Sequence, residues 1–219
     1  MKALVAGATG QTGRRIVQTL VDRGIPVRSL VRNLETAKTN LPPGSELAVG
    51  DVLIPSTLTP AIADCTFLIC ATGSSPSLDP TGPYKVDYIG VKNLVDAAKA
   101  NGVKHFVLVS SLCVSKVFHP LNLFWFILVW KKLAEGYLQK SGLTYTVVRP
   151  GGLLMEDNSK PILMSAEDTL FEGSIPRIKV AQVCVEALNQ PSAQNRILEV
   201  IAKEEAAERS FEELFATLT

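Results

Sequence analysis

The residues best suited to bind a phosphate stand near the start of the chain, in the segment Gly7-Ala-Thr-Gly-Gln-Thr-Gly13. This segment follows the apolar run Ala3–Ala6 and precedes an amphipathic stretch at residues 12–23. Glycines permit a tight turn and a close approach of backbone to ligand, and a helix that follows directs unpaired N–H groups toward a phosphate. We therefore predict a dinucleotide site here, with a purely structural turn as the alternative. The expected contacts are Gly7, Thr9, Gly10, Gln11, Thr12 and Gly13.

A cation, Arg32, stands at the end of the second expected strand, where sites specific for NAD place an acid for the ribose 2′-hydroxyl. An arginine can pair in bidentate fashion with a 2′-phosphate, so Arg32 favours NADP(H) over NAD(H), with a solvated surface arginine as the alternative. After the third strand, Asp51 could accept from the adenine amine while Val52 packs on the ring. A capping aspartate is the other interpretation.

Small residues follow two of the later strands. Ala71, Thr72 and Gly73 would let a ribose and a pyrophosphate lie against the backbone after the fourth strand. Pro150 and Gly151 would turn the chain past a nicotinamide after the sixth. Plain loops would have the same composition, so these contacts are expectations that depend on the glycine segment.

Short β-branched apolar segments alternate with amphipathic stretches along the rest of the chain. Strands are expected at residues 3–6, 26–31, 46–49, 66–71, 105–110, 144–149 and 197–201, and helices at 12–23, 86–100, 127–140 and 179–189. This alternation indicates an α/β fold of the Rossmann type, a doubly wound parallel sheet with helices on both faces. Open sheets of this kind bind ligands at the carboxyl ends of their strands.

Composition limits the classes of function. One domain over residues 1–219 is expected, with a small substrate-side segment at residues 153–177. The chain has 22 lysines and arginines against 21 acids, so no basic field exists for a nucleic acid backbone. Its four cysteines form no CxxC pair, and we expect no metal site.

Several motifs along nearly the whole chain resemble those of the atypical short-chain dehydrogenases/reductases, which are NmrA-like NAD(P)-binding proteins. They are Gly7-Ala-Thr-Gly-Gln-Thr-Gly13, Leu30-Val-Arg32, Gly50-Asp51, Val86-Asp-Tyr-Ile-Gly-Val-Lys-Asn93, Val107-Leu-Val-Ser-Ser111, Val129-Trp-Lys131, Ala134-Glu135 and Val148-Arg-Pro-Gly-Gly152. The Trp-Lys and Arg-Pro-Gly-Gly sequences are similar to those of chloroplast and cyanobacterial members, related to the NADP-binding domain of the redox-sensing subunit of the chloroplast inner-envelope translocon. That resemblance implies ferredoxin-NADP reductase as a protein partner.

Reductases of this family use a Ser to polarise the carbonyl, a Tyr to supply the proton, and a Lys four residues later to hold the nicotinamide ribose. The resemblance places the serine at Ser111 or Ser110 and the lysine at Lys131. The tyrosine position is then Ile127, which has no proton to donate. Ser111 and Lys131 are the expected catalytic residues, and Ser110 and Lys131 are expected to contact the cofactor.

Three other residues have a functional and a structural interpretation. Tyr88 begins a literal YxxxK, but it precedes the serine, so we interpret it as a packed helix residue. Cys113 near the expected nicotinamide edge could sense redox state, although an inert buried thiol is favoured. For His119, a hydrogen-bonded loop side chain is favoured over a proton donor.

Residues 117–130 form an apolar and aromatic run that is too short to span a bilayer. It could be a helix packed into the core or a dimer interface, a lid over an apolar substrate pocket, or a surface that docks a membrane or a protein. We favour the packed helix because Leu123, Ile127 and Trp130 fall at helical spacing.

Two function classes remain open. The first is an NADPH-dependent oxidoreductase that passes hydride to a small-molecule acceptor such as a carbonyl, quinone or flavin. The second is a non-catalytic module that reports NADP(H) occupancy to a protein partner. Strand-like sequence from Lys2 onward predicts a cytoplasmic protein, or one of the chloroplast stroma if a precursor was trimmed.

Overall fold

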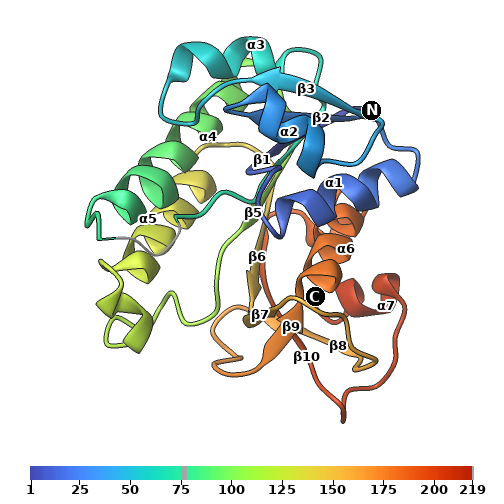
Figure 1. The fold of residues 1–219 in the computed structure, drawn as a ribbon. Helices are drawn as coiled ribbons and strands as arrows, with labels where there is room; N and C mark the ends of the chain where they lie inside the picture. Colours follow the sequence, from blue (N-terminus) through green and yellow to red (C-terminus); the bar gives the residue numbers. More distant parts are fainter. Residues whose placement is uncertain (75–77, 219) are drawn as a thin grey trace.

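The computed structural model describes residues 1–74 and 78–218, and a sheet of eight strands forms its centre (Figure 1). The strands lie in the order β3-β2-β1-β4-β5-β6-β10-β8. Their bounds are β1 Ala3–Ala6, β2 Val27–Val31, β3 Ser45–Val49, β4 Phe67–Cys70, β5 His105–Val109, β6 Tyr145–Pro150, β8 Ile162–Ala166 and β10 Arg196–Ala202. All neighbours from β3 to β10 are parallel, which confirms the expected doubly wound Rossmann-type sheet.

Helices cover both faces of the sheet (Figure 1). One face carries α1 (Gly13–Asp22), α6 (Arg177–Ala187) and α7 (Phe211–Ala216), and the other carries α3 (Leu58–Ile62), α4 (Val91–Ala100) and α5 (Ile127–Gln139). The shorter α2 (Leu34–Asn40) follows β2. Side chains alternate along each strand, so Val5 faces the α1 and α6 side while Leu4 faces α3 and α4.

The strand order reverses between β1 and β4. From β1 the chain builds β2 and β3 on one side, and it then returns to add β4 and β5 on the other. Connections that leave the two central strands in opposite directions open a crevice at their carboxyl ends. The glycine loop between β1 and α1 lies at this reversal, which is where a ligand is expected.

Three strands and several helical segments differ from the expected pattern. β8 joins the sheet antiparallel to β10, and β7 (Gly152–Leu154) pairs with β9 (Ser174–Pro176) in a separate two-stranded sheet. The helix expected at residues 86–100 begins as a π-helix, Tyr84–Gly90, before α4. Short 3₁₀ helices occupy Pro55–Thr57, Pro120–Leu123 and Pro191–Ala193.

The segment at residues 153–177 contributes strands to both sheets, and its two end residues, Leu153 and Arg177, line the cleft. The Glu199 carboxylate on β10 accepts backbone hydrogen bonds from Asp168, Thr169 and Leu170, which fixes the loop that follows β8. Across residues 1–74 and 78–218, no helix combines the length and apolar character needed to cross a bilayer.

Candidate functional site

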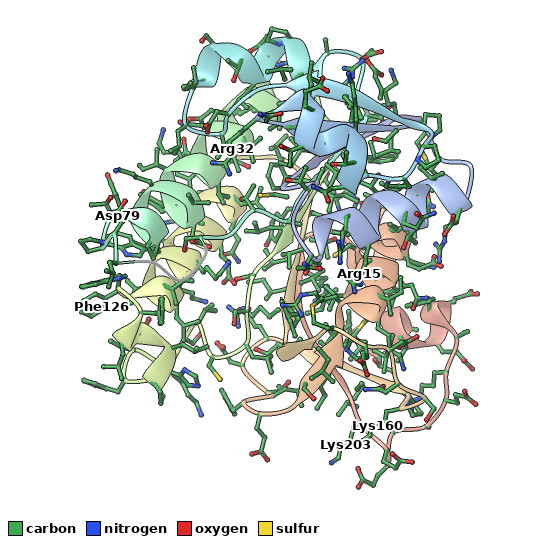
Figure 2. All side chains as sticks on the ribbon, viewed as in Figure 1. Arg15, Arg32, Asp79, Phe126, Lys160 and Lys203 are labelled. Atoms are coloured by element: carbon green, nitrogen blue, oxygen red, sulfur yellow. The ribbon has the colours of Figure 1, made fainter. Side chains whose placement is uncertain are left out.

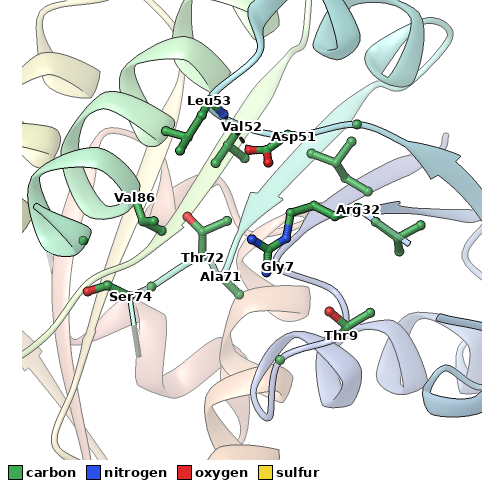
Figure 3. Close-up of a pocket in the computed structure, with 16 residues that line it drawn as sticks. Gly7, Thr9, Arg32, Asp51, Val52, Leu53, Ala71, Thr72, Ser74 and Val86 are labelled. Carbon is green, nitrogen blue, oxygen red and sulfur yellow. Dashed lines mark hydrogen bonds between the residues drawn. The ribbon is translucent and has the colours of Figure 1, made fainter. Parts of the chain in front are cut away.

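A cleft runs along the carboxyl edge of the sheet, from the end of β3 to the end of β6. It consists of two adjoining cavities, of about 470 and 350 Å³, that share Gly10, Ala71, Thr72, Gly73 and Ser74. The first cavity (Figure 3) also contains Gly7, Thr9, Arg32, Asp51 and Val52, and the second contains Gln11, Thr12, Ser110, Ser111, Lys131, Pro150 and Gly151. Of the residues expected at the cofactor and catalytic sites, only Gly13 lines neither cavity.

The three glycines of the loop have different roles. Gly7 has a φ of +78° and lies so close to β4 that a Cβ atom would be 2.6 Å from the Ala71 carbonyl oxygen. A Cβ atom on Gly13 would overlap the Gly7 carbonyl, so this buried glycine lets the helix start against the loop. Gly10 faces the cleft, where a Cβ atom would meet only the Gly7 oxygen at 3.2 Å. A side chain at position 10 would therefore occupy ligand space.

The first turn of α1 offers free hydrogen-bond donors. The backbone N–H groups of Gln11, Thr12 and Gly13 have no acceptor within the part of the chain that the structure describes, whereas those of Arg14 and Arg15 donate to Gly10 and Thr12. Unpaired amides at a helix start, with the positive end of the helix dipole, form a site for a phosphate. Because these N–H groups are free, the glycine loop and the start of α1 can bind the pyrophosphate of a dinucleotide.

Arg32 and Asp51 border the first cavity from the ends of β2 and β3. Arg32 extends across the opening beside Gly7 (Figure 3), and no carboxylate lies within 4.0 Å of its guanidinium among the described residues. Asp51 uses one carboxylate oxygen to accept from the Leu53 amide at 2.9 Å. This contact forms a local turn and does not cap the 3₁₀ helix that starts at Pro55, whose N-cap is Ile54, so the capping role expected as an alternative for Asp51 is absent. The Asp51 side chain lines the cavity.

The second cavity contains the residues expected beside a nicotinamide. Ser111, Lys131 and Ile127 line it together, and no tyrosine lines either cavity in the described ranges. Pro150 and Gly151 form its wall at the end of β6. A Cβ atom on Gly151 would lie 2.6 Å from the Gly173 carbonyl oxygen, so glycine is needed where β6 passes the loop before β9.

A buried ionic network distinguishes the two serines. The Ser110 hydroxyl donates to Glu135 at 2.5 Å, and Arg149 binds both oxygens of that carboxylate at 3.0 and 2.8 Å. Arg149 also contacts Glu199 and Asp168 and is fully buried. Although burial disfavours its charge, these acids raise the pKa of Arg149 above the ordinary arginine value. Ser110 is therefore held by the framework.

Ser111 has the opposite environment. Ser111 lines the second cavity, and its hydroxyl has no hydrogen-bond partner among the described residues, so the hydroxyl is free to bind a ligand. Of the two serines that the sequence left open, Ser110 is hydrogen-bonded to Glu135 and Ser111 has a free hydroxyl in the part of the chain that the structure describes.

Lys131 is held by a residue that the sequence analysis did not select. Its Nζ atom lies 2.9 Å from Oδ1 of Asp87, a carboxylate with no exposed surface. The other oxygen of Asp87 accepts from the amide and hydroxyl of Ser74, at 3.0 and 2.7 Å. Asp87 therefore connects Lys131 on α5 to the loop after β4. The only signal in the sequence was its place in the Val86-Asp-Tyr motif.

The other candidates lie outside the two cavities. Tyr88 packs against Tyr84 and Trp130, as expected for a helix residue. Cys113 donates to the Phe171 carbonyl, and burial raises the pKa of its thiol, which opposes a reactive thiolate. His119 accepts from the Leu121 amide at the start of a 3₁₀ helix. The structural interpretation is thus the better one for all three.

The expectation of a packed helix over residues 117–130 is wrong for residues 117–126. Leu123 is 88% exposed and Phe118 is fully exposed, and α5 begins only at Ile127. Trp125 and Phe126 have positive φ values, a conformation that a continuous helix does not contain. The exposed apolar side chains of this segment are Val117, Phe118, Leu121, Leu123, Phe124, Trp125 and Phe126, hereafter the 117–126 surface.

Comparison with known proteins agrees with this geometry. A family model described as NAD(P)H-binding matches residues 7–191, a range that includes the whole cleft. The chain belongs to this NAD(P)H-binding family. The motif-based resemblance to its NmrA-like members is confirmed, since the NAD(P)H-binding chain is 37% identical to the chloroplastic protein TIC 62 of Pisum sativum, with 91% of the chain and 42% of TIC 62 covered.

Two other relatives match over more of their length. The NAD(P)H-binding chain is 46% identical to an uncharacterized chloroplastic protein of Arabidopsis thaliana, with 99% of the chain and 82% of the relative covered. It is 34% identical to sanguinarine reductase of Eschscholzia californica, with 100% and 96% covered. A solved structure from Bacillus halodurans, of the NAD-dependent epimerase/dehydratase type, superposes with a TM-score of 0.88 at 27% identity, and both chains are covered completely.

Proposed function

We propose that this protein is an NADPH-dependent oxidoreductase that passes hydride to an acceptor requiring no tyrosine as proton donor, such as a quinone or a flavin. The observation that carries the proposal is one continuous cleft, with free phosphate donors and Arg32 at one end and Ser111 with Lys131 at the other. A bound nicotinamide dinucleotide would supply the hydride. The similarity to sanguinarine reductase supports the reductase class.

The residues of the second cavity would orient the acceptor and balance charge. The Ser111 hydroxyl can donate to an oxygen or nitrogen that gains electron density, and Lys131 lines the same cavity. Reduction of a quinone consumes one hydride and one proton, and water can supply the proton through the open mouth. Ile127 leaves the tyrosine position apolar, which disfavours simple aldehydes and ketones that need a positioned acid.

Replacing Ser111 tests the reductase proposal. Ser111→Ala is expected to lower kcat with quinones or flavins about 100-fold, since a donor aimed at developing charge is lost, while the Kd for NADPH changes little. Anaerobic NADPH titration followed by stopped-flow oxidation would measure both values. Ser110→Ala serves as the matched comparison: it removes a framework hydrogen bond and should lower thermal stability instead. Equal turnover in wild type and Ser111→Ala would count against the role of Ser111.

Arg32 is the basis for proposing NADP(H) over NAD(H). Arg32→Glu is expected to weaken NADPH about 100-fold, because a charge-assisted contact to the 2′-phosphate becomes a repulsion. NADH is the internal control, since it lacks that phosphate, and its Kd should change less than about 3-fold. Titration of both nucleotides by intrinsic fluorescence gives the two values. An equal loss for NADPH and NADH would refute the assignment of Arg32.

A second candidate function is a module that reports NADP(H) occupancy to a protein partner. The observation that favours it is the position of α5, which carries Lys131 in the cleft and begins directly after the exposed 117–126 surface. Ferredoxin-NADP reductase is the partner that the motif resemblance suggests. Tight NADPH binding with no turnover on quinones, flavins and aldehydes, and co-elution with that reductase, would favour this candidate.

A further inference from the structure

Two arginines lie close together beside the second cavity, and one of them lines it. Arg177, the first residue of α6, lines that cavity, and Arg15 lies on the neighbouring α1 (Figure 2). Both guanidiniums contact Met155. Arg15 donates to the Met155 carbonyl at 3.0 Å, and Arg177 lies 3.4 Å from the Met155 Sδ atom. The two positive groups are therefore held close together by the segment that follows β7.

Neither arginine has an acidic partner within residues 1–74 and 78–218. Arg177 donates to the Leu153 carbonyl at 2.9 Å and Arg15 to the Gln11 carbonyl at 2.7 Å, and no carboxylate lies within 4.0 Å of either guanidinium in the described residues. Partial burial and the adjacent Arg15 charge lower the pKa of Arg177, as expected for like charges without a counterion. An arginine has five N–H donors, so donors remain free on both side chains.

The position of the pair indicates which ligand it would meet. Ser111 and Lys131 line the same cavity as Arg177, so a molecule beside the nicotinamide position can extend to Arg177. Arg15 lies next to Arg177, since both guanidiniums contact Met155. The free amides of Gln11 and Thr12 at the start of α1 would supply hydrogen-bond donors for a cofactor pyrophosphate. Arg177 and Arg15, which have no carboxylate partner among the described residues, would therefore bind a second anion, separate from the pyrophosphate.

We propose that Arg177 and Arg15 bind the phosphate or carboxylate group of an anionic hydride acceptor. This inference rests on the proposed reductase function and narrows its substrate class. Each guanidinium is fixed by a backbone carbonyl, so little side-chain freedom is lost when the anion binds. A planar, delocalised cation suits either anion, and the pair selects charged acceptors over neutral ones of the same ring system.

FMN and riboflavin are suitable probes because they share one redox-active ring and differ by a phosphate. The Kd values for the NADP⁺-saturated protein can be measured by quenching of flavin fluorescence, and kcat/KM can be measured separately with NADPH. We expect wild type to bind FMN at least about 10-fold more tightly than riboflavin, since one charge-assisted contact contributes about that factor. The preference should fall as ionic strength rises.

Arg177→Gln should abolish the preference for FMN and leave the Kd for riboflavin and for NADPH within about 2-fold of wild type. Arg177→Lys keeps the charge and should retain part of the preference even if the start of α6 is perturbed. Arg196→Gln is the matched control: it removes one exposed positive charge at the first residue of β10, at the amino edge of the sheet and away from the cleft at the carboxyl edge. Circular dichroism and thermal unfolding verify that each variant is folded.

The outcomes separate this inference from the reductase proposal. FMN preference that depends on Arg177 without any NADPH oxidation would support the anion site and overturn the reductase. Turnover of FMN and riboflavin with equal kcat/KM would support the reductase and overturn the anion site. A third outcome is a loss of NADPH affinity in Arg177→Gln while the ratio of the Kd values for riboflavin and FMN stays unchanged. That result would assign the arginines to the cofactor phosphates and would also overturn the anion site for the acceptor.

Discussion

Gly10→Asp is expected to abolish NADPH binding, with at least a 100-fold increase in Kd, while the protein stays folded. The backbone at Gly10 suits any residue, since a Cβ atom there would meet only one atom, at 3.2 Å, and its side chain would point into the cleft. A carboxylate in that space would take the amides of Gln11 to Gly13 and repel the pyrophosphate.

Two companion variants make this result specific. Gly10→Ala adds only a methyl group and should weaken NADPH far less than aspartate does. Gly13→Ala, in contrast, forces a methyl group onto the Gly7 carbonyl and should destabilise the fold itself. Isothermal titration gives the affinities, and thermal unfolding shows whether each variant is folded. A folded Gly10→Asp protein with wild-type NADPH affinity would contradict the cofactor site.

Arg149→Met is expected to produce the largest loss of stability, about 3–5 kcal/mol, because it leaves buried carboxylates without a cation. Glu135 is fully buried and Glu199 is 1% exposed, so neither can recover its charge stabilisation from water. Ser110 and the loop at residues 168–170 depend on the same carboxylates. Urea denaturation monitored by fluorescence would measure the change in free energy of unfolding.

A double variant tests the cause of that loss. Glu135→Gln in the Arg149→Met background removes one buried carboxylate that has lost its cation, and it should recover part of the lost stability. Arg196→Met, an exposed arginine one strand away, is the control and should change the free energy of unfolding by less than about 0.5 kcal/mol. A loss below about 1 kcal/mol for Arg149→Met would show that the network contributes little.

The sequence was sufficient for features encoded over a few neighbouring residues. The spacing of Gly7, Gly10 and Gly13 after an apolar run predicted the loop at the end of β1, because strand, turn and helix follow one another along the chain. The alternation of β-branched segments with amphipathic stretches likewise predicted the seven parallel strands. The carboxyl-edge rule then placed Arg32 and Ser111 on one cleft.

The segment at residues 117–130 shows where local patterns failed. The spacing of Leu123, Ile127 and Trp130 fits a helix, yet the chain turns through two residues with positive φ before α5 begins. The Asn122 side chain stabilises this turn, since it donates to the Val117 carbonyl and accepts from the Leu128 amide. A single buried asparagine outweighs the apolar periodicity, and no count of hydrophobic residues reveals it.

By itself, the sequence determined the fold class and the glycine loop between β1 and α1, and it placed the expected site residues at the carboxyl edge of the sheet, because each depends on local order or on strand ends. Only the tertiary structure decided which of two adjacent serines is free, which carboxylate holds Lys131, and which arginines stand together. Those answers join residues far apart in the chain, as with Ser110 and Glu135, Asp87 and Lys131, or Arg15 and Met155. Their physical basis is the packing of α1, α5 and α6 against one sheet, which brings distant charges within hydrogen-bond distance.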